Sequence, residues 1–232
     1  MRTVGLLGGL SWVSSAEYYR LLNEHVNREL GGVHSASCVL VSVDFAEIER
    51  MQLEDRWDDA GRVLGEAARR LEAAGADVVL ICSNTMHKVA DDVQAAVGIP
   101  VLHIADVTAE AVKAAGVSKV ALLGTRYVME QLYLRDRLAS HGLEVVVPEA
   151  ADRAEVNRII FEELVVDRFL ENSREFYREV IRRLAATGVQ GVILGCTEIE
   201  LLVSAQDSVL PVFPTTRLHV QAAVNTMNGT IL

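Results

Sequence analysis

Apolar and polar positions follow two alternating patterns along the whole chain. Short apolar runs, such as "VVLI" at 78–81, are typical of buried strands. Longer stretches between them place apolar residues every three or four positions, as an amphipathic helix does. This alternation predicts βαβ units, and therefore an α/β fold with mostly parallel sheets flanked by helices.

The two patterns set the expected elements. The first long helix opens on Ser14 or Ser15, where a hydroxyl can cap it, and the next one ends at Gly75. The expected strands are 3–8, 37–45, 76–83, 100–104, 119–124, 143–148, 189–196 and 209–215. The expected helices are 14–30, 55–74, 86–97, 106–115, 128–141, 152–187, 197–204 and 214–228.

The chain also repeats itself. "TVGLLGG" at 3–9 resembles "KVALLGT" at 119–125, a separation of 116 residues. "GADVVLICSNT" at 75–85 resembles "GVQGVILGCTE" at 188–198 without a gap, a separation of 113 residues. A repeat of this size predicts two related α/β halves.

We place the break near Gly98 to Val101. The first lobe is expected to hold residues 1–98 and 213–232, with the last helix returning to pack on it, and the second lobe residues 99–212. Ligands of open parallel sheets bind beyond the carboxyl ends of the strands. Two facing halves would therefore surround one cleft with four strand-end loops, which are Gly8–Ser11, Ser83–Thr85, Gly124–Tyr127 and Gly195–Glu198.

Ser83 and Cys196 occupy equivalent positions in the repeat and would approach this cleft from opposite sides. At this point the two residues could form a functional site or have only a structural role. Duplicated strands also reflect common architecture, and a cysteine at a strand end is often a packing residue. Cys38 and Cys82 lie within apolar runs and are expected in the core. Side chains alternate along a strand, so Cys82 should point away from whatever Ser83 faces.

Composition narrows the function classes. Half of the 232 residues are apolar, mean hydropathy is +0.23 and the formal net charge is −10, without a basic run. This argues against nucleic acid and anionic membranes as partners. There is no apolar run of about 18 residues and no leader typical of secretion. Three widely spaced cysteines are unlike a disulfide framework or a zinc site. We expect a cytoplasmic protein.

The sequence lacks the motifs of several common functional sites. "GLLGGLS" lacks the G-x-G-x-x-G spacing of a dinucleotide site, and the chain has neither a P-loop nor a G-x-S-x-G elbow. The six histidines do not cluster at metal-ligand spacings, so no metal is expected. The strand-end loops are instead rich in helix N-termini and small polar residues, namely Ser11, Ser83, Asn84, Thr85, Thr125 and Thr197. Such loops suit a small carboxylate, although the same residues can serve as helix caps.

These motifs resemble one family along essentially the whole chain. The chain is similar to the cofactor-independent aspartate/glutamate racemases, and most to the subgroup that is specific for L-aspartate and L-glutamate or has broad amino-acid specificity. The stretches that carry the resemblance are "GLLGGLSWVSSAEYYR" at 5–20, "SVDFAEIERMQ" at 42–52, "CSNTMHKVAD" at 82–91, "ALLGTRYVMEQ" at 121–131, "IIFEELV" at 159–165 and "GCTEIELLV" at 195–203.

The resemblance implies a two-base site without pyridoxal phosphate or any other cofactor. One residue removes the α-proton and a second protonates the opposite face. The family commonly uses two cysteines, and here they correspond to Cys196 and, as a hydroxyl, Ser83. Since an alkoxide is scarce at pH 7, Cys196 is the expected base, its pKa lowered by nearby donors. The L-to-D direction should then be the faster in initial rate.

The resemblance also implies the substrate contacts. The candidate substrate-binding residues are Leu10, Ser11, Gln52, Asn84, Thr85, Thr125, Arg126, Tyr127, Thr197 and Glu198. Aspartate-specialised members carry a lysine after "ELV", whereas this chain has Val166, which weakens the case for strict aspartate use. His87 is expected to orient its loop rather than move protons. The family further suggests a homodimer.

Two other functions remain in view. The wider superfamily includes decarboxylases and cis–trans isomerases of small diacids, and a site with a single thiol suits protonation on one face. A catalytically silent homologue that binds an amino acid or another carboxylate is the third reading, with Ser83 marking lost chemistry.

Overall fold

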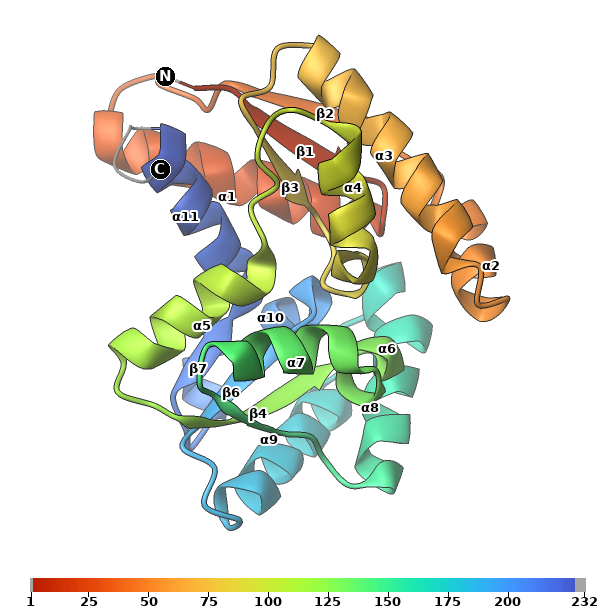
Figure 1. Cartoon of the computed structure of the whole chain (residues 1–232). Helices are drawn as coiled ribbons and strands as arrows, with labels where there is room; N and C mark the ends of the chain where they lie inside the picture. Colours follow the sequence, from red (N-terminus) through yellow and green to blue (C-terminus); the bar gives the residue numbers. More distant parts are fainter. Residues whose placement is uncertain (1, 228–232) are drawn as a thin grey trace. The chain divides into compact units, whose positions relative to one another are not determined.

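The computed structural model of the chain describes residues 2–227 (Figure 1). The chain divides into two compact units. The first holds the chain as far as His103 and again from His219, and the second runs from Ile104 to Leu218. The sequence predicted boundaries between the units after residue 98 and before residue 213. Both boundaries fall a few residues later in the structure.

The first unit is built on a parallel sheet with the strand order β2-β1-β3. Its strands are β1 (Val4–Gly8), β2 (Cys38–Ser42) and β3 (Val78–Ile81). One face packs against α1 (Trp12–Leu30) and the end of α11 (Thr215–Met227), in a core that includes Leu6, Tyr18 and Val224. The opposite face packs against α3 (Trp57–Ala73), which comes so close at Gly5 that an added Cβ would lie 3.2 Å from the Leu71 Cβ. The other helices are α2 (Phe45–Leu53), η1 (Thr85–Val89) and α4 (Ala90–Ala96).

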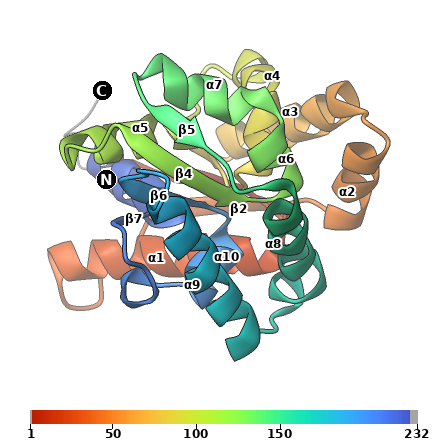
Figure 2. The same ribbon diagram turned by 90° about the horizontal axis from the view of Figure 1, so that it is seen from below.

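The second unit has four parallel strands in the order β5-β4-β6-β7. They are β4 (Lys119–Gly124), β5 (Glu144–Val146), β6 (Gly191–Gly195) and β7 (Val212–Pro214). Figure 2 shows this sheet with helices on both faces. The helices are α5 (Ile104–Ala114), α6 (Arg126–Glu130), α7 (Leu132–Ser140), α8 (Ala150–Glu162), η2 (Leu164–Val166), α9 (Glu171–Ala185), α10 (Thr197–Leu202) and η3 (Ala205–Asp207).

The side chains of β4 point alternately to the two faces of the sheet, so they contribute to two separate parts of the core. Val120 and Leu122 of β4 pack with α5 and α7 on one face. Ala121 and Leu123 pack with α8, α9 and α10 on the other. Both faces are therefore covered, as expected for parallel strands that are almost continuously apolar. The expected α/β class, with two parallel sheets flanked by helices, is confirmed.

The two sheets pair their repeated strands in the same register. Val4 of β1 lies opposite Val78 of β3, and Val120 of β4 lies opposite Gly191 of β6. These are the residues that the repeat relates, because 4 plus 116 is 120 and 78 plus 113 is 191. In both units the strand carrying the second motif therefore ends beside the strand carrying the first.

Several expected elements differ from the structure. The first helix begins at Trp12 with Ser11 as its cap, and not on Ser14 or Ser15 as expected. Residues 100–104 form only one bridge, Val101 to Val79, and α5 begins already at Ile104. Phe45 starts α2 instead of ending a strand, because Asp44 caps that helix by accepting the Ala46 N–H at 3.1 Å. Expected helix 128–141 is two helices, since Gln131 has an extended backbone with ψ 153°.

The expected long helix at 152–187 is also broken. α8 ends at Glu162, a short 3₁₀ turn follows, and Asp167 adopts a left-handed backbone with φ 60°. Buried Glu163 holds this break, since its carboxylate accepts from Ser173 Oγ at 2.5 Å and from Arg158 Nη2 at 2.8 Å. The polar contacts of Glu163 thus override the helical pattern.

Candidate active site

In the first unit, the loop after β1 is strained and tightly tied down. Ser11 has φ 128°, an uncommon value for a residue with a side chain, and its hydroxyl accepts the Ser14 N–H at 3.4 Å as the cap of α1. Gly9 has φ 76°, and a Cβ there would lie 2.1 Å from the Val43 carbonyl oxygen, so only glycine fits. Leu10 and Ser11 are both buried.

The loop after β1 is joined to the turn that follows β3. Ser14 Oγ donates to the Cys82 carbonyl at 2.9 Å, and the Cys82 N–H donates to the Leu7 carbonyl at 2.9 Å. The loops Gly8–Ser11 and Ser83–Thr85, which the repeat placed at strand ends, are thus brought together within this unit.

Ser83 is half-buried at the start of this turn. Its Oγ accepts the Met86 N–H at 3.3 Å, which leaves the hydroxyl proton to be donated elsewhere. His87 Nδ1 lies 2.7 Å from the Ser83 carbonyl oxygen. Because a carbonyl oxygen only accepts, Nδ1 carries the proton, and the ring holds the backbone of Ser83, the contact of a residue that orients its loop.

The other predicted residues of this unit are buried around the same turn. Asn84 and Thr85 begin the 3₁₀ turn η1. Gln52 comes from α2, and its Nε2 lies 3.0 Å from the Met86 sulfur. The Gln52 amide is therefore engaged by the β3 turn rather than by solvent.

A cluster of buried histidines, which sequence spacing did not reveal, lies behind the Ser83 turn. The His87 ring centroid is 4.7 Å from that of His103 and 5.6 Å from that of His219. His219 Nε2 donates to the Leu102 carbonyl at 2.8 Å, so Nδ1 accepts from the Tyr18 hydroxyl at 2.9 Å. Burial and the neighbouring His87 lower the pKa of His219 to about 3.

In the second unit, Cys196 follows β6 directly and stands at the N-cap of α10. Its side chain is buried, and its thiol donates to Glu198 Oε2 at 3.1 Å. Glu198 Oε1, which is also buried, has no hydrogen-bond partner among the described residues. A thiol and a carboxylate therefore form a pair with one acceptor oxygen left open.

The surroundings of Cys196 act on its pKa in the direction opposite to the one expected. Burial, followed by the negative charge and hydrogen bond of Glu198, holds the pKa of the thiol well above its ordinary value. Backbone N–H groups of Glu198 and Ile199 favour the thiolate but do not outweigh these effects. The sequence predicted the donors at the helix start but not that a carboxylate would face the sulfur.

The loop after β4 lies beside Cys196 in this unit. Gly124 is opposite Gly195 in the sheet, and a Cβ on Gly124 would lie 2.8 Å from the Gly195 carbonyl oxygen. The loops Gly124–Tyr127 and Gly195–Glu198 are thus neighbours. Thr125 caps α6 by accepting the Val128 N–H at 3.4 Å.

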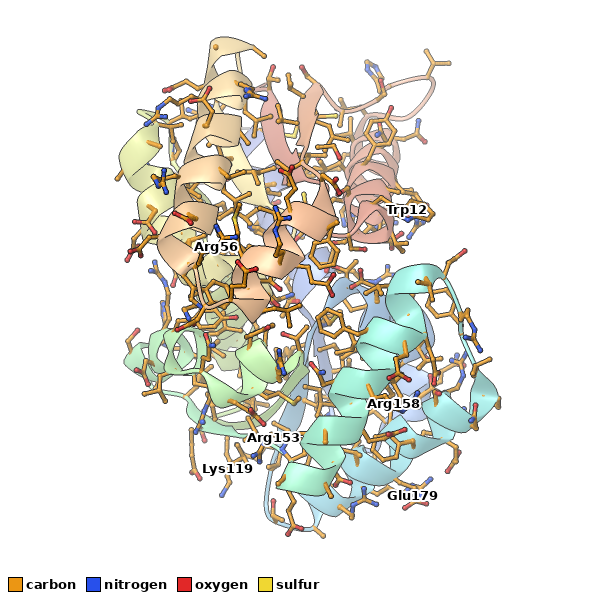
Figure 3. The ribbon with its side chains drawn as sticks, turned by 90° about the vertical axis from the view of Figure 1, so that its right-hand side faces the viewer. Trp12, Arg56, Lys119, Arg153, Arg158 and Glu179 are labelled. Carbon is orange, nitrogen blue, oxygen red and sulfur yellow. The ribbon has the colours of Figure 1, made fainter. Side chains whose placement is uncertain are left out.

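Arg126 is an exposed cation on the loop after β4. Its Nη2 donates to the Tyr127 hydroxyl at 2.9 Å, and its guanidinium lies 4.9 Å from the centre of the Tyr127 ring. Its backbone N–H donates to Asn157 Oδ1 at 2.9 Å. Within residues 2–227 Arg126 forms no salt bridge. Two arginines of α8, both labelled in Figure 3, differ from it, since Arg153 pairs with one glutamate and Arg158 with three.

Three residues near Cys196 were not predicted from the sequence, namely Glu200, Thr215 and Thr216. Thr197 Oγ1 lies 2.9 Å from Thr216 Oγ1, and the Thr216 N–H donates to Glu200 Oε1 at 2.7 Å. Thr215 Oγ1 donates to the Leu194 carbonyl at 2.9 Å. The carboxyl ends of β6 and β7 are joined through these contacts. Only the position of Thr215 and Thr216 at the end of an expected strand could have pointed to them.

Of the remaining cysteines, Cys82 lies in the core, as expected, whereas Cys38 is only half-buried and packs against the core. Cys82 is fully buried and its thiol points back to the Leu80 carbonyl, 3.8 Å away. Burial raises the pKa of Cys82 far above its ordinary value and also raises that of half-buried Cys38. Ser83, and not Cys82, is therefore the side chain available at the end of β3.

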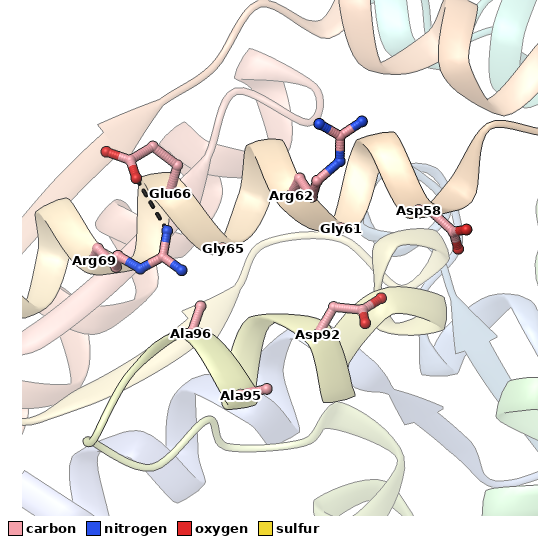
Figure 4. Close-up of a pocket in the computed structure, with 9 residues that line it drawn as sticks. All are labelled: Asp58, Gly61, Arg62, Gly65, Glu66, Arg69, Asp92, Ala95 and Ala96. Atoms are coloured by element: carbon pink, nitrogen blue, oxygen red, sulfur yellow. Dashed lines mark hydrogen bonds and ion pairs between the residues drawn. The ribbon is translucent and has the colours of Figure 1, made fainter.

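A groove between α3 and α4 contains none of the predicted site residues. It has a volume of about 550 Å³ and is lined by charged residues that include Arg62, Glu66 and Asp92 (Figure 4). Gly61 and Gly65 allow the two helices to approach, since a Cβ on Gly65 would lie 3.0 Å from the Ala96 Cβ. The groove follows from helix packing on the outside of the first unit.

Comparison with known proteins assigns the family. A model of the family described as Asp/Glu/Hydantoin racemase matches residues 7–223. The chain belongs to this family. The expected resemblance is thereby confirmed, and as a member of the Asp/Glu/hydantoin racemases the protein is an amino-acid racemase, an isomerase.

Solved structures and a curated relative agree with this assignment. The protein is similar to a putative Asp/Glu racemase from Yersinia pestis, with 54% identity, a TM-score of 0.90, and coverage of 97% of this chain and 99% of that one. An aspartate racemase homologue from Pyrococcus horikoshii OT3 has 34% identity and a TM-score of 0.85 over 98% and 100% of the two chains. The broad specificity amino-acid racemase RacX of Bacillus subtilis (strain 168) is 21% identical over 169 residues, 73% of each chain.

Two features are absent from the part of the chain that the structure describes. Residues 2–227 contain no group of three or more histidine, cysteine or acidic side chains arranged to hold a metal ion. In the same residues no helix combines the length and apolarity needed to cross a membrane.

Proposed function

We propose that this racemase acts on L-aspartate, L-glutamate or a broader set of amino acids without a cofactor, with Cys196 removing the α-proton and Ser83 reprotonating the opposite face. The observation that carries the proposal is the pairing of the Cys196 thiol with Glu198 at the end of β6, 3.1 Å apart. The equivalent position in the first unit carries Ser83, whose hydroxyl proton is free to be donated.

The reaction begins with the thiol proton. Cys196 has a raised pKa, so it needs an acceptor before it can act as a base. Glu198 Oε2 already accepts the thiol hydrogen and can take the proton, which leaves a thiolate beside a neutral carboxylic acid. Burial of both groups makes this exchange less costly than leaving two negative charges together.

The thiolate then takes the α-proton of the L-amino acid. The electron pair of the broken C–H bond moves into the substrate carboxylate, which gains a second negative charge. Preorganised donors are the means by which a protein stabilises such an intermediate. We assign this role to the strand-end loops, whose candidate donors are Ser11, Asn84, Thr85, Thr125, Tyr127 and Thr197.

Ser83 completes the turnover by giving its hydroxyl proton to the opposite face of the α-carbon. The resulting alkoxide accepts the Met86 N–H, which stabilises its charge until solvent returns a proton. Cys196 now holds the α-proton of the substrate, and Glu198 releases the former thiol proton to solvent, which restores the resting pair of thiol and carboxylate. Because an alkoxide is a far stronger base than a thiolate, it is hardly populated in the resting enzyme. The L-to-D direction should therefore start faster than the reverse, while the equilibrium between enantiomers is unchanged.

Substrate choice depends on few charged groups. We assign Arg126 to the distal carboxylate, since it is exposed and lacks a salt bridge within residues 2–227. Val166, on the short turn η2, is 57% exposed and offers no charge. With Arg126 as a single cation for the distal carboxylate, the site can accept a range of substrate side chains. We further propose that the enzyme works as a cytoplasmic homodimer.

A decarboxylase or isomerase of a small diacid is the second candidate. The observation that favours it is the single available thiol, since the Cys82 sulfur points into the core. A decarboxylase needs only one proton donor, because loss of carbon dioxide rather than proton removal creates the carbanion.

One experiment separates these functions. The protein is incubated in D2O with a panel of L- and D-amino acids and with malonate-type diacids, and α-proton exchange is followed by NMR beside the Cys196→Ala variant. Racemisation predicts deuterium in the product enantiomer and its loss on thiol deletion. Release of carbon dioxide from the diacids would favour decarboxylation. A ligand-induced thermal shift without turnover would indicate a silent binding protein, and exchange that survives Cys196→Ala would refute the assigned base.

A further inference from the structure

The turn that carries Cys196 is not held in place by its own helix. α10 has only six residues, and the side chain at its N-cap makes no capping hydrogen bond. A helix this short is unstable by itself, so its position must come from contacts with other elements. The contacts that fix it therefore decide where the thiol lies.

Both ends of this turn reach the same residue of another helix. Thr216, fully buried in the first turn of α11, has its Oγ1 2.9 Å from that of Thr197, the residue after Cys196. Its backbone N–H donates at 2.7 Å to Glu200, four residues after Cys196. Thr216 thus binds the beginning and the end of the segment from Thr197 to Glu200.

Glu200 belongs to α10 but caps the N-terminus of α11. The first N–H groups of a helix have no partner within it, and the positive end of the helix dipole favours an acceptor there. Glu200 Oε1 fills that place at the start of α11, with Thr215 Oγ1 at 3.4 Å. Burial raises the pKa of Glu200 to about 8, whereas the donors of Thr216 oppose this effect.

The side chain of Thr216 is not explained by packing alone. Valine has the same shape, whereas a buried hydroxyl must find a partner to offset the loss of water. Here the partner is a hydroxyl adjacent to the proposed base. A shift of this pair would move the Cys196 sulfur relative to the Glu198 carboxylate.

We propose that Thr216 is a positioning residue for Cys196, acting through Thr197 and Glu200. This inference rests on the proposed function in so far as Cys196 is taken as the base. Thr216 sets the geometry of the thiol and its carboxylate partner without touching the substrate.

The test compares three variants. Thr216→Val removes the hydroxyl at constant shape, and Thr216→Ser restores it. Thr226→Val is the matched control, because Thr226 is a buried threonine of the same helix whose hydroxyl, among residues 2–227, donates to the Ala222 carbonyl at 3.0 Å. Thermal unfolding checks the fold of each, and Thr216→Ala replaces Thr216→Val if the latter does not fold.

Two readouts are expected to change together. Thr216→Val should lower kcat for α-proton exchange of the L-substrate by about 10- to 100-fold with a smaller change in KM, since misplacement of a catalytic group acts on the chemical step. It should also shift the pH midpoint of Cys196 alkylation by iodoacetamide, followed residue by residue with mass spectrometry. Thr216→Ser should return both readouts towards the wild type, and Thr226→Val should match the wild type.

Failure of the inference about Thr216 can be told apart from failure of the proposed racemase function. If the wild type shows no exchange, the racemase proposal fails, while the alkylation profile still reports on Thr216. If a folded Thr216→Val protein keeps both the wild-type kcat and the wild-type alkylation profile, Thr216 does not position the thiol. An equal loss in Thr226→Val would show that general weakening of α11 is the cause, and would likewise refute the inference.

Discussion

The Cys196 thiol donates a hydrogen bond to Glu198 Oε2 at 3.1 Å, and both residues follow the same buried strand. A carboxylate facing a buried thiol keeps the sulfur protonated in the resting protein. It also gives the thiol proton a place to go when a substrate arrives. The same contact therefore raises the barrier to forming a thiolate and supplies the acceptor for its formation.

Glu198→Gln should lower the pKa of Cys196 relative to the wild type. The substitution removes a negative charge and a carboxylate acceptor, two of the causes that raise this pKa, although burial remains the largest. The pH dependence of iodoacetamide labelling at Cys196, resolved by mass spectrometry, measures the change. Labelling of Cys38 serves as the control within the same protein. A midpoint for Cys196 at the wild-type pH or higher would contradict the assigned pairing.

Ser83→Cys should raise the initial D-to-L rate. A thiol has an ordinary pKa of about 8.5, so a useful fraction is ionised near neutrality where serine has almost none. We expect an increase of about tenfold or more, within the range for a positioned acid or base. Circular dichroism of each enantiomer's conversion follows the rate. Ser83→Thr, which keeps a hydroxyl, is the matched control, and an unchanged D-to-L rate in Ser83→Cys would count against Ser83 as the second group.

Val166→Lys should shift preference towards aspartate. Val166 is 57% exposed on η2, so a longer side chain can be accommodated. A hydrogen bond to a charged group contributes about 1.5–3 kcal/mol, which corresponds to about a 10- to 100-fold gain in kcat/KM for aspartate over an uncharged amino acid. Val166→Gln adds similar length without charge and should give much less. Equal effects of lysine and glutamine would rule out a charged contact.

Acid should destabilise the protein through His219. The folded-state pKa of about 3 lies below the unfolded value of 6.5, so the unfolded chain binds a proton first as the pH falls. The stability that neutral His219 contributes is complete above pH 6.5 and is lost as the pH drops towards 3. Its ring faces Tyr18, Leu102 and His87, so none of these partners within residues 2–227 supplies an anion to compensate the charge.

Urea unfolding at pH 7 and pH 5 measures this effect. Between these values the wild type should lose about 2 kcal/mol more than His219→Gln, because one proton is taken up by the unfolded chain over about 1.5 pH units. Glutamine cannot titrate but keeps a donor for the Leu102 carbonyl. His34→Gln, at an exposed position, should retain the wild-type slope. If His219→Gln has the same slope as the wild type, His219 is not responsible.

The parts of this protein that depend on local pattern could be predicted from its residues. Apolar runs and helical spacing predicted the α/β class and strand β4 at 119–124, because residues 120–123 are apolar on both faces of the sheet. The repeat predicted which strands would correspond, and the common register of Val4 with Val78 and of Val120 with Gly191 follows from it. Motif resemblance led to the family that comparison then confirmed for residues 7–223.

Features that depend on which side chains the fold places in contact could not be read from local pattern. The break at Glu163 comes from Ser173 and Arg158. Residues 100–104 form only the bridge of Val101 to Val79, because α5 already begins at Ile104. The contact of Thr216 with Thr197 and the neutral state of His219 likewise rest on burial and on hydrogen bonds across the fold. Periodicity reports which face of an element is apolar, whereas the electrostatics of a buried group depend on which side chains the fold places against it.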